Sequence, residues 1–122
     1  MKKYLCVFFA ILVFCICIGC QGWTRADTYR QVAGTALLAV DWMQTREISQ
    51  NPDRFYERNP ILGSHPRTGE VDTYFAASAA ATWAIAAILP SGFWREAFQY
   101  GLIGVEAGVV IGNHLVGVRI GF

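Results

Sequence analysis

The sequence predicts an all-α fold: a small membrane bundle of three to four helices, counting an N-terminal hydrophobic segment. Hydrophobic residues make up 54% of the 122-residue chain and charged residues only 16%. This length allows one domain, and a domain of this size buries only about two-thirds of its surface. A proline- and glycine-rich loop at residues 49–71 separates apolar runs of helical length. We therefore expect the lipid bilayer to be the partner that covers the remaining apolar surface.

The first twenty residues form a separate segment, either a signal peptide or an uncleaved signal anchor. Lys2 and Lys3 precede an apolar run over residues 4–18, which is the order of a secretory signal. The last five residues of the segment resemble the lipobox of bacterial lipoproteins, and this resemblance implies cleavage before Cys20 and its acylation. Cys17 stands where the lipobox has an aliphatic residue, so the anchor remains an alternative. Both interpretations predict the bacterial inner membrane as the location.

Residues 21–122 are expected to form one helical membrane domain. Its first helix is predicted over Asp27–Ile48. The apolar middle of this helix, Val32–Met43, contains Asp41 and is shorter than the roughly twenty residues that cross a bilayer. The helix therefore either crosses as a tilted or partly buried span or lies in the membrane interface.

Two further helices are predicted after the loop. Asp72 occupies an N-cap position before the almost uncharged run Thr73–Leu89, which Pro90 ends. Ser91 is expected to cap the last helix, whose apolar body spans Ala97–Val118. The last helix is long enough to cross a bilayer, and the preceding one is slightly short.

The basic residues indicate an orientation for a four-span arrangement with a cytoplasmic N-terminus. The cytoplasmic segments then hold Lys2, Lys3, Arg46, Arg54, Arg58, Arg67 and Arg119, and the outer segments hold Arg25, Arg30 and Arg95. This bias agrees with the positive-inside rule.

Small residues predict how the helices pack. In lipid, helices associate where small side chains allow close backbone approach. The last helix carries such a row at Gly104, Gly108 and Gly112, and the preceding helix carries a matching row at Ala76, Ala80 and Ala84. We expect these rows to form a close pair, and the same faces favour a homo-oligomer.

Polar residues within the apolar helices are the candidate functional groups. Glu106 and Asn113 share a stripe that faces away from the glycine row, and a carboxylate in a membrane helix marks a bundle interior, a cavity or a pairing partner. Asp41 and Thr45 share a face of the first helix. If these helices pack together, two carboxylates meet in one interior, which suits proton transfer or cation binding. The alternatives are a Glu106 that locks helices together and an Asp41 in the headgroup region.

The loop contains the most distinctive string in the chain. Glu57, Asn59 and His65 place a carboxylate, an amide and an imidazole within nine residues, which could bind a substrate or a metal ion. The alternative is structural: Asn59 caps a turn, Pro60 and Gly63 set its geometry, and the glutamate pairs with an arginine. The spacing matches no metal motif, so we expect no metal and no cofactor.

The distribution of charges and cysteines and the absence of known motifs exclude several classes of function. The net charge is +1 and the basic residues are scattered, so no nucleic-acid partner is expected. All cysteines lie within the first twenty residues, which excludes a disulfide framework or a zinc site in the helical domain. The sequence has no phosphate-binding loop and no nucleophile elbow, so we expect no catalytic residues.

Residues 40–119 resemble a group of small bacterial and phage membrane proteins. The resemblance rests on a D-x-x-Q-T helix at residues 41–45, an E-x-N-P-x-L-G-x-H-P loop at residues 57–66 and the small-residue helix around residues 106–113. That group has no assigned activity, so the resemblance implies architecture and not a reaction. It also implies that Asp41, Thr45, Glu57, Asn59, Glu106 and Asn113 belong to one constellation.

Three functional hypotheses follow from these patterns. The first is a structural or accessory integral membrane protein, encoded by a phage or mobile element, whose polar residues hold the bundle together. The second is a small channel, holin-like pore or ion-binding protein that uses Asp41 and Glu106, since a ring of carboxylates favours cations. The third, a membrane-embedded enzyme, needs Glu57, His65 and one of those carboxylates within hydrogen-bond reach of a substrate.

Overall fold

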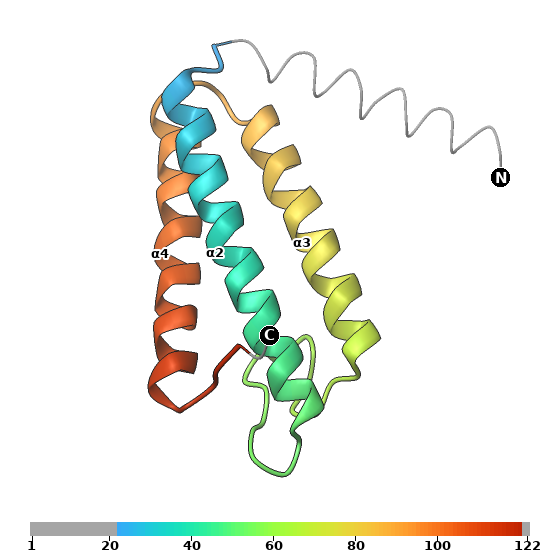
Figure 1. Ribbon diagram of the computed structural model, residues 1–122. Coiled ribbons are helices and arrows are strands. Elements are labelled where there is room, and N and C mark those ends of the chain that lie inside the picture. The colour runs from blue at the N-terminus through green and yellow to red at the C-terminus, as the bar shows by residue number, and fades with distance from the viewer. Residues whose placement is uncertain (1–21, 121–122) are drawn as a thin grey trace, which may run out of the picture.

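The computed structural model describes residues 22–120, and over that range it contains three α-helices and no strand. They are α2 (Arg25–Gln50), α3 (Thr68–Ile88) and α4 (Phe93–Leu115), with the predicted loop between α2 and α3 (Figure 1). The all-α class is therefore confirmed. The predicted signal segment, with Cys20, lies outside the described residues.

α2 begins two residues before the predicted Asp27 because a capping box closes its first turn. The Thr24 hydroxyl accepts the Asp27 N–H at 3.1 Å, and the Asp27 carboxylate accepts the Thr24 N–H at 2.8 Å. These reciprocal bonds satisfy two backbone donors that an uncapped helix leaves without partners.

The predicted start of α3 was wrong by more than a turn. The helix begins at Thr68, where the Glu70 carboxylate accepts the Arg67 N–H at 2.9 Å and so closes the first turn. Asp72, predicted as the N-cap, lies inside the helix and ties it to α2. It accepts hydrogen bonds from the Trp42 indole at 2.7 Å and from Arg46 at 3.2 Å.

α4 is bounded by glycines at both ends. Its N-cap is Gly92, at φ 89°, in place of the predicted Ser91. It ends before Gly117, where φ of 93° allows the Val118 N–H to reach the Asn113 carbonyl at 3.0 Å. The helix is therefore shorter than predicted at this end, and Val118 folds back into a buried position.

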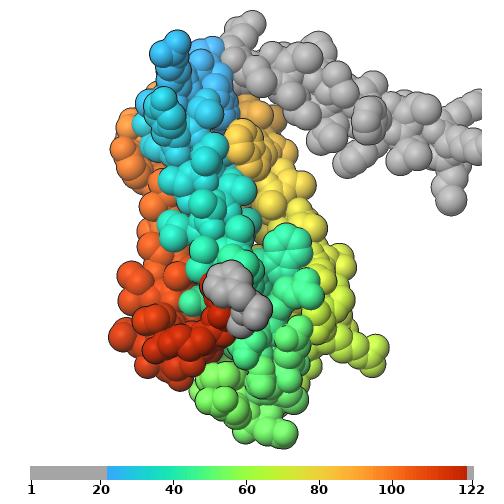
Figure 2. Space-filling model, in the orientation of Figure 1, coloured from blue at the N-terminus to red at the C-terminus, as the bar shows by residue number. Residues whose placement is uncertain are grey.

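α2 is the centre of the bundle, with α3 packed on one side and α4 on the other (Figures 1 and 2). α4 runs parallel to α2, because residues 27 and 41 of α2 meet residues 99 and 113 of α4. α3 runs antiparallel to both. The predicted close pair of α3 and α4 is therefore wrong: these two helices share few contacts.

Within residues 22–120, the glycine row of α4 does not mediate helix packing. A methyl group placed on Gly104, Gly108 or Gly112 would meet nothing within 4 Å, and Ala76 and Ala80 of α3 are exposed. The two rows do not meet because directional hydrogen bonds attach α3 and α4 to α2 instead.

The glycine that allows close approach is Gly34 of α2. A Cβ atom at this position would lie 2.8 Å from Cδ2 and 3.1 Å from Cγ of Leu102. No side chain can therefore be added at Gly34 unless α4 shifts or Leu102 repacks.

A small apolar cluster joins α2 to α3. Leu38, Val71 and Phe75 are buried together, and the Trp42 ring stacks on Phe75 with centroids 6.2 Å apart. Further along, the Trp83 indole donates to the Thr35 hydroxyl at 3.0 Å. Aromatic stacking and indole hydrogen bonds therefore position α3.

We predict that Gly34→Leu destabilises the bundle by about 1–3 kcal/mol, because the added side chain overpacks the contact with Leu102. Gly108→Leu is the matched control, since it gains the same helix propensity at an open position. Loss of helical circular dichroism on denaturation in detergent measures both. Equal stability of the two variants would contradict the packing described for α2 and α4.

Candidate functional site

One face of α2 buries polar side chains along most of its length. The buried positions are Asp27, Gln31, Gly34, Leu38, Asp41, Gln44, Thr45 and Ile48. Apart from Gln44, they alternate by four and three residues, which is the spacing of a face that packs along a partner helix. We call the five polar positions in this set, Asp27, Gln31, Asp41, Gln44 and Thr45, the polar seam.

At the N-terminal end of the seam, Gln99 of α4 is fully buried among partners from α2. Its amide donates to the Asp27 carbonyl at 3.0 Å and to the Gln31 side chain at 3.2 Å, and its oxygen accepts from Arg30 at 3.0 Å. Arg30 also pairs with Asp27 at 2.6 Å. One glutamine side chain therefore joins α4 to three residues of α2.

Arg95 links all three helices at this end. Its guanidinium donates to the carbonyls of Ala86 at 2.9 Å and Leu89 at 2.8 Å, which are free because α3 ends there. It lies 3.6 Å from the Asp27 carboxylate and 5.0 Å from the centre of the Trp23 ring. The buried arginine thus acts as a C-cap for α3 and a counter-charge for α2.

The charge of Asp27 is stabilised by its neighbours at the start of α2. Burial acts to raise the pKa of this carboxyl. Hydrogen bonds from the Thr24 backbone and hydroxyl and from Arg30, together with the arginine's positive charge, outweigh burial and hold the pKa below its ordinary value. Asp27 is therefore a charged structural group at neutral pH.

Near the C-terminal end of the seam, Asn113 of α4 joins the two helices in the same way as Gln99 does at the other end, through its side-chain amide. Its amide donates to Asp41 and to Gln44, each at 3.2 Å. Gln44 in turn donates to the Val110 carbonyl at 3.2 Å, and Thr45 donates to Asp41 at 3.4 Å. The predicted stripe containing Asn113 does face α2.

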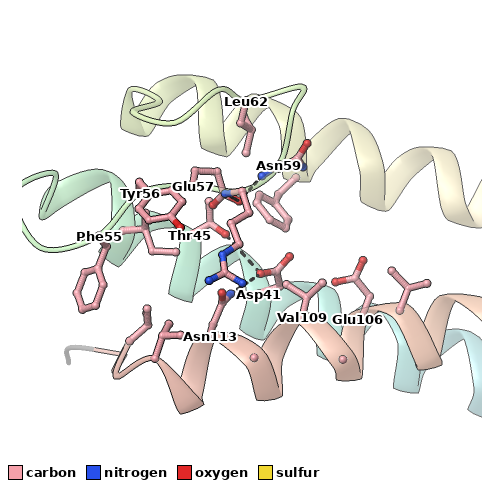
Figure 3. A pocket seen from close by; sticks show the side chains of 18 of the residues that line it. Asp41, Thr45, Phe55, Tyr56, Glu57, Asn59, Leu62, Glu106, Val109 and Asn113 are labelled. Atoms are coloured by element: carbon pink, nitrogen blue, oxygen red, sulfur yellow. Dashed lines mark hydrogen bonds between the residues drawn. The ribbon is translucent and has the colours of Figure 1, made fainter.

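A cavity of about 710 Å³ opens beside this group, between α4, the loop and the first turns of α3 (Figure 3). All six residues of the predicted constellation line it: Asp41, Thr45, Glu57, Asn59, Glu106 and Asn113. Figure 3 shows the Asp41 and Glu106 side chains projecting into a common space, with Glu57 and Asn59 on its loop side. The glycines of α4 form part of another wall.

The loop residues have mainly structural partners. Asn59 accepts the Ile61 N–H at 2.9 Å, so its predicted role as a turn cap is confirmed. Glu57 accepts the N–H groups of Arg58 and Asn59, each at 2.8 Å, where pairing with an arginine was predicted. His65 is exposed and does not line the cavity. The structure thus separates the imidazole from the carboxylates.

The cavity contains carboxylate oxygens that lack partners. Oε2 of Glu57 and Oε2 of Glu106 are buried and form no hydrogen bond within the described chain. Both carboxylates lie close enough to Asp41 to act on it electrostatically. Buried acceptors without donors are costly, so this cavity favours a ligand that carries N–H or O–H groups.

No metal cluster accounts for these carboxylates. Within residues 22–120, no group of three or more histidine, cysteine, aspartate or glutamate side chains is placed to hold a metal ion. The carboxylates can therefore accept hydrogen bonds and attract a positive charge, but they do not form a ligand sphere by themselves.

Sequence reasoning missed the group formed by Gln31, Gln99 and Arg95. A signal for it exists: in α4, polar residues recur at positions 95, 99, 106 and 113 of a mainly apolar helix. These intervals of four and seven residues mark one helix face, as do intervals of four, ten and four residues at positions 27, 31, 41 and 45 of α2.

By length and composition, α3 is the one described helix that qualifies as a membrane span, and only 17% of its most apolar window is buried within the chain. Comparison with known proteins matched no family model, no curated protein and no solved structure.

We predict that Gln99→Met lowers the stability of the folded chain by about 1–3 kcal/mol, because buried groups of Asp27 and Gln31 and the partly buried Arg30 lose a partner. Gln50→Met, at the exposed end of α2, is the matched control and should change little. Chemical denaturation in detergent, followed by circular dichroism, compares the two. A neutral Gln99→Met would show that the buried hydrogen bonds do not stabilise the pairing of α2 with α4.

Proposed function

We propose that the chain is an integral membrane protein with a structural or accessory role, in which polar side chains hold three helices together within the bilayer. The observation that carries this proposal is the distribution of polarity. Among the residues that the structure describes, more polar and charged residues than hydrophobic residues are buried, while large hydrophobic side chains are exposed along all three helices. Water-soluble domains have the opposite arrangement.

The exposed aromatic residues support the same proposal. Tyr29, Phe93, Trp94 and Tyr100 are all more than half exposed, and all lie near the N-terminal ends of α2 and α4. Aromatic side chains gather at this level where a helix crosses the membrane–water interface. Asp27, Arg30 and Arg95 lie at the same end of the bundle. The proposed membrane-spanning part therefore begins on the side of these residues that faces the middle of the bundle.

The opposite end of the bundle has the character of a cytoplasmic face. The loop carries Arg54, Arg58 and Arg67, and Arg46 lies near the end of α2. The positive-inside rule places such segments in the cytoplasm. In this orientation α2 and α4 run inward and α3 runs outward across a bacterial inner membrane.

An accessory role follows from how the interior polar groups are used. Within the described chain, the side chains of Gln99, Asn113 and Arg95 bond to other helices or to helix ends. Such hydrogen bonds hold membrane helices together where the hydrophobic effect no longer operates. The first hypothesis is thus favoured by the partners of these groups.

The second hypothesis, a cation-binding protein, is favoured by the cavity. Asp41, Glu57 and Glu106 line one space, and two of their oxygens are buried without donors. A cation held there would offset their mutual repulsion. The enzyme hypothesis has no comparable support, because His65 lies apart from these carboxylates.

Labelling of single cysteines from the two sides of the membrane tests the proposed crossing. Ser64→Cys lies in the loop, and Ser91→Cys lies in the turn between α3 and α4. In a chain whose native cysteines are replaced by serine, we expect a membrane-impermeant maleimide to label the first from the cytoplasmic side only. The second should react from the opposite side only. Reaction of both from one side would contradict a membrane-spanning α3.

Cation flux through proteoliposomes separates the accessory role from a channel. Because no pore is built into the accessory bundle, we expect the full-length protein to leave proton and potassium leakage at the level of protein-free vesicles. A protein-dependent leak that Glu106→Gln abolishes, with Glu96→Gln as the control, would overturn this expectation in favour of the second hypothesis.

A further inference from the structure

The cavity beside α4 combines three kinds of surface. Carboxylates from α2, the loop and α4 face the interior, two arginines of the loop line its edge, and aliphatic and glycine residues of α4 form a smooth wall. Its volume of about 710 Å³ lies within the range of sites that hold small organic molecules. A ligand that matches it therefore has a positive group, a negative group and an apolar part.

The carboxylates identify the positive group. Asp41 is nine-tenths buried, and both of its hydrogen bonds within the described chain go to Oδ1, so Oδ2 accepts none. Glu57 and Glu106 each add a buried oxygen without a donor. A primary ammonium group supplies one charge and three N–H donors, which match these acceptors. A quaternary ammonium supplies the charge without the donors.

The arginines identify the negative group. Arg54 and Arg58 line the cavity and are exposed, with guanidinium groups lying 5.3 Å and 5.9 Å from the centres of the Phe55 and Tyr56 rings. The fork of donors on a guanidinium suits a phosphate group. Neither arginine forms a salt bridge within the described chain.

The wall of α4 identifies the apolar part. Gly104, Gly108 and Gly112 leave space that no side chain of the described protein fills within 4 Å. Val105 and Val109 border that space and are exposed. An extended hydrocarbon chain fits a surface of this kind, which is continuous with the face that meets lipid under the proposed function.

We propose that this cavity binds the headgroup of a phospholipid that carries a primary amine, such as phosphatidylethanolamine in the cytoplasmic leaflet. The ammonium contacts Asp41, Glu57 and Glu106, the phosphate contacts Arg54 and Arg58, and an acyl chain lies along the glycine row. The inference rests on the proposed membrane location and adds the identity of a bound lipid to it.

Native mass spectrometry of the full-length protein in detergent tests this site with three lipids of identical acyl chains. These are phosphatidylethanolamine, phosphatidylcholine and phosphatidylglycerol. We expect the ethanolamine lipid to be retained about tenfold better than the choline lipid, the size of effect that one charge-assisted hydrogen bond produces. The glycerol lipid should be retained least, because it has no cation for the carboxylates.

Substitutions of cavity residues test whether the preference for the ethanolamine lipid arises in this cavity. Glu106→Gln should reduce the preference for ethanolamine over choline, and Glu57→Gln should do the same while keeping the acceptor that closes the loop turn. Glu96→Gln, in the same helix but outside the cavity, is the control and should retain it. Arg58→Gln should weaken binding of the ethanolamine and choline lipids alike, leaving their ratio unchanged.

Equal retention of the three lipids, or preference for phosphatidylglycerol, would overturn the assigned lipid. A preference that survives both Glu106→Gln and Glu57→Gln would overturn the assigned cavity. These outcomes are distinct from failure of the membrane proposal, which cysteine labelling detects independently. Circular dichroism of each variant establishes that a lost preference does not reflect a lost fold.

Discussion

The bundle depends on the hydrogen bonds between the polar seam of α2 and two amide side chains of α4. Gln99 at one end and Asn113 at the other each reach residues of α2 about 70 positions earlier in the chain. Between them Gly34 lets the helices approach closely. Because amide hydrogen bonds are directional, they set the register and rotation of α4 as well as its distance, which apolar contacts would leave freer.

α3 is held by different chemistry. Its contacts with α2 are made by large aromatic rings and by the indole bonds of Trp42 and Trp83. Because indole rings combine a broad apolar surface with one donor, they position a helix that has few polar groups of its own. α2 therefore has two contact faces: a polar face that bonds to α4 and a face that packs against the aromatic rings of α3. The polar face explains why α2 is less apolar than α3.

Local patterns in the sequence predicted the number of helices after the signal segment, the loop between them and the turn at Asn59. They also anticipated that Asp41 and Glu106 would meet if their helices packed together, because helical periodicity fixes which side chains share a face. Partner choice was not predictable in this way. The small-residue rows suggested pairing of α3 with α4, but spacing alone does not reveal that Gln99, Asn113 and Arg95 have better partners elsewhere. The start of α3 was misplaced because Asp72, a frequent cap residue, serves a contact between helices.

For a chain that spans the membrane as proposed, the parallel arrangement of α2 and α4 has a consequence for biogenesis. A helix is made and inserted in sequence order, and Asp41 receives its amide partner from a residue 72 positions later. Until α3 has crossed back and α4 has followed, the polar face of α2 has no protein to cover it. During that interval the nascent chain depends on the insertion machinery, on water or on lipid headgroups to shield Gln31 and Asp41. Truncation anywhere before α4 would leave that face permanently without its amide partners.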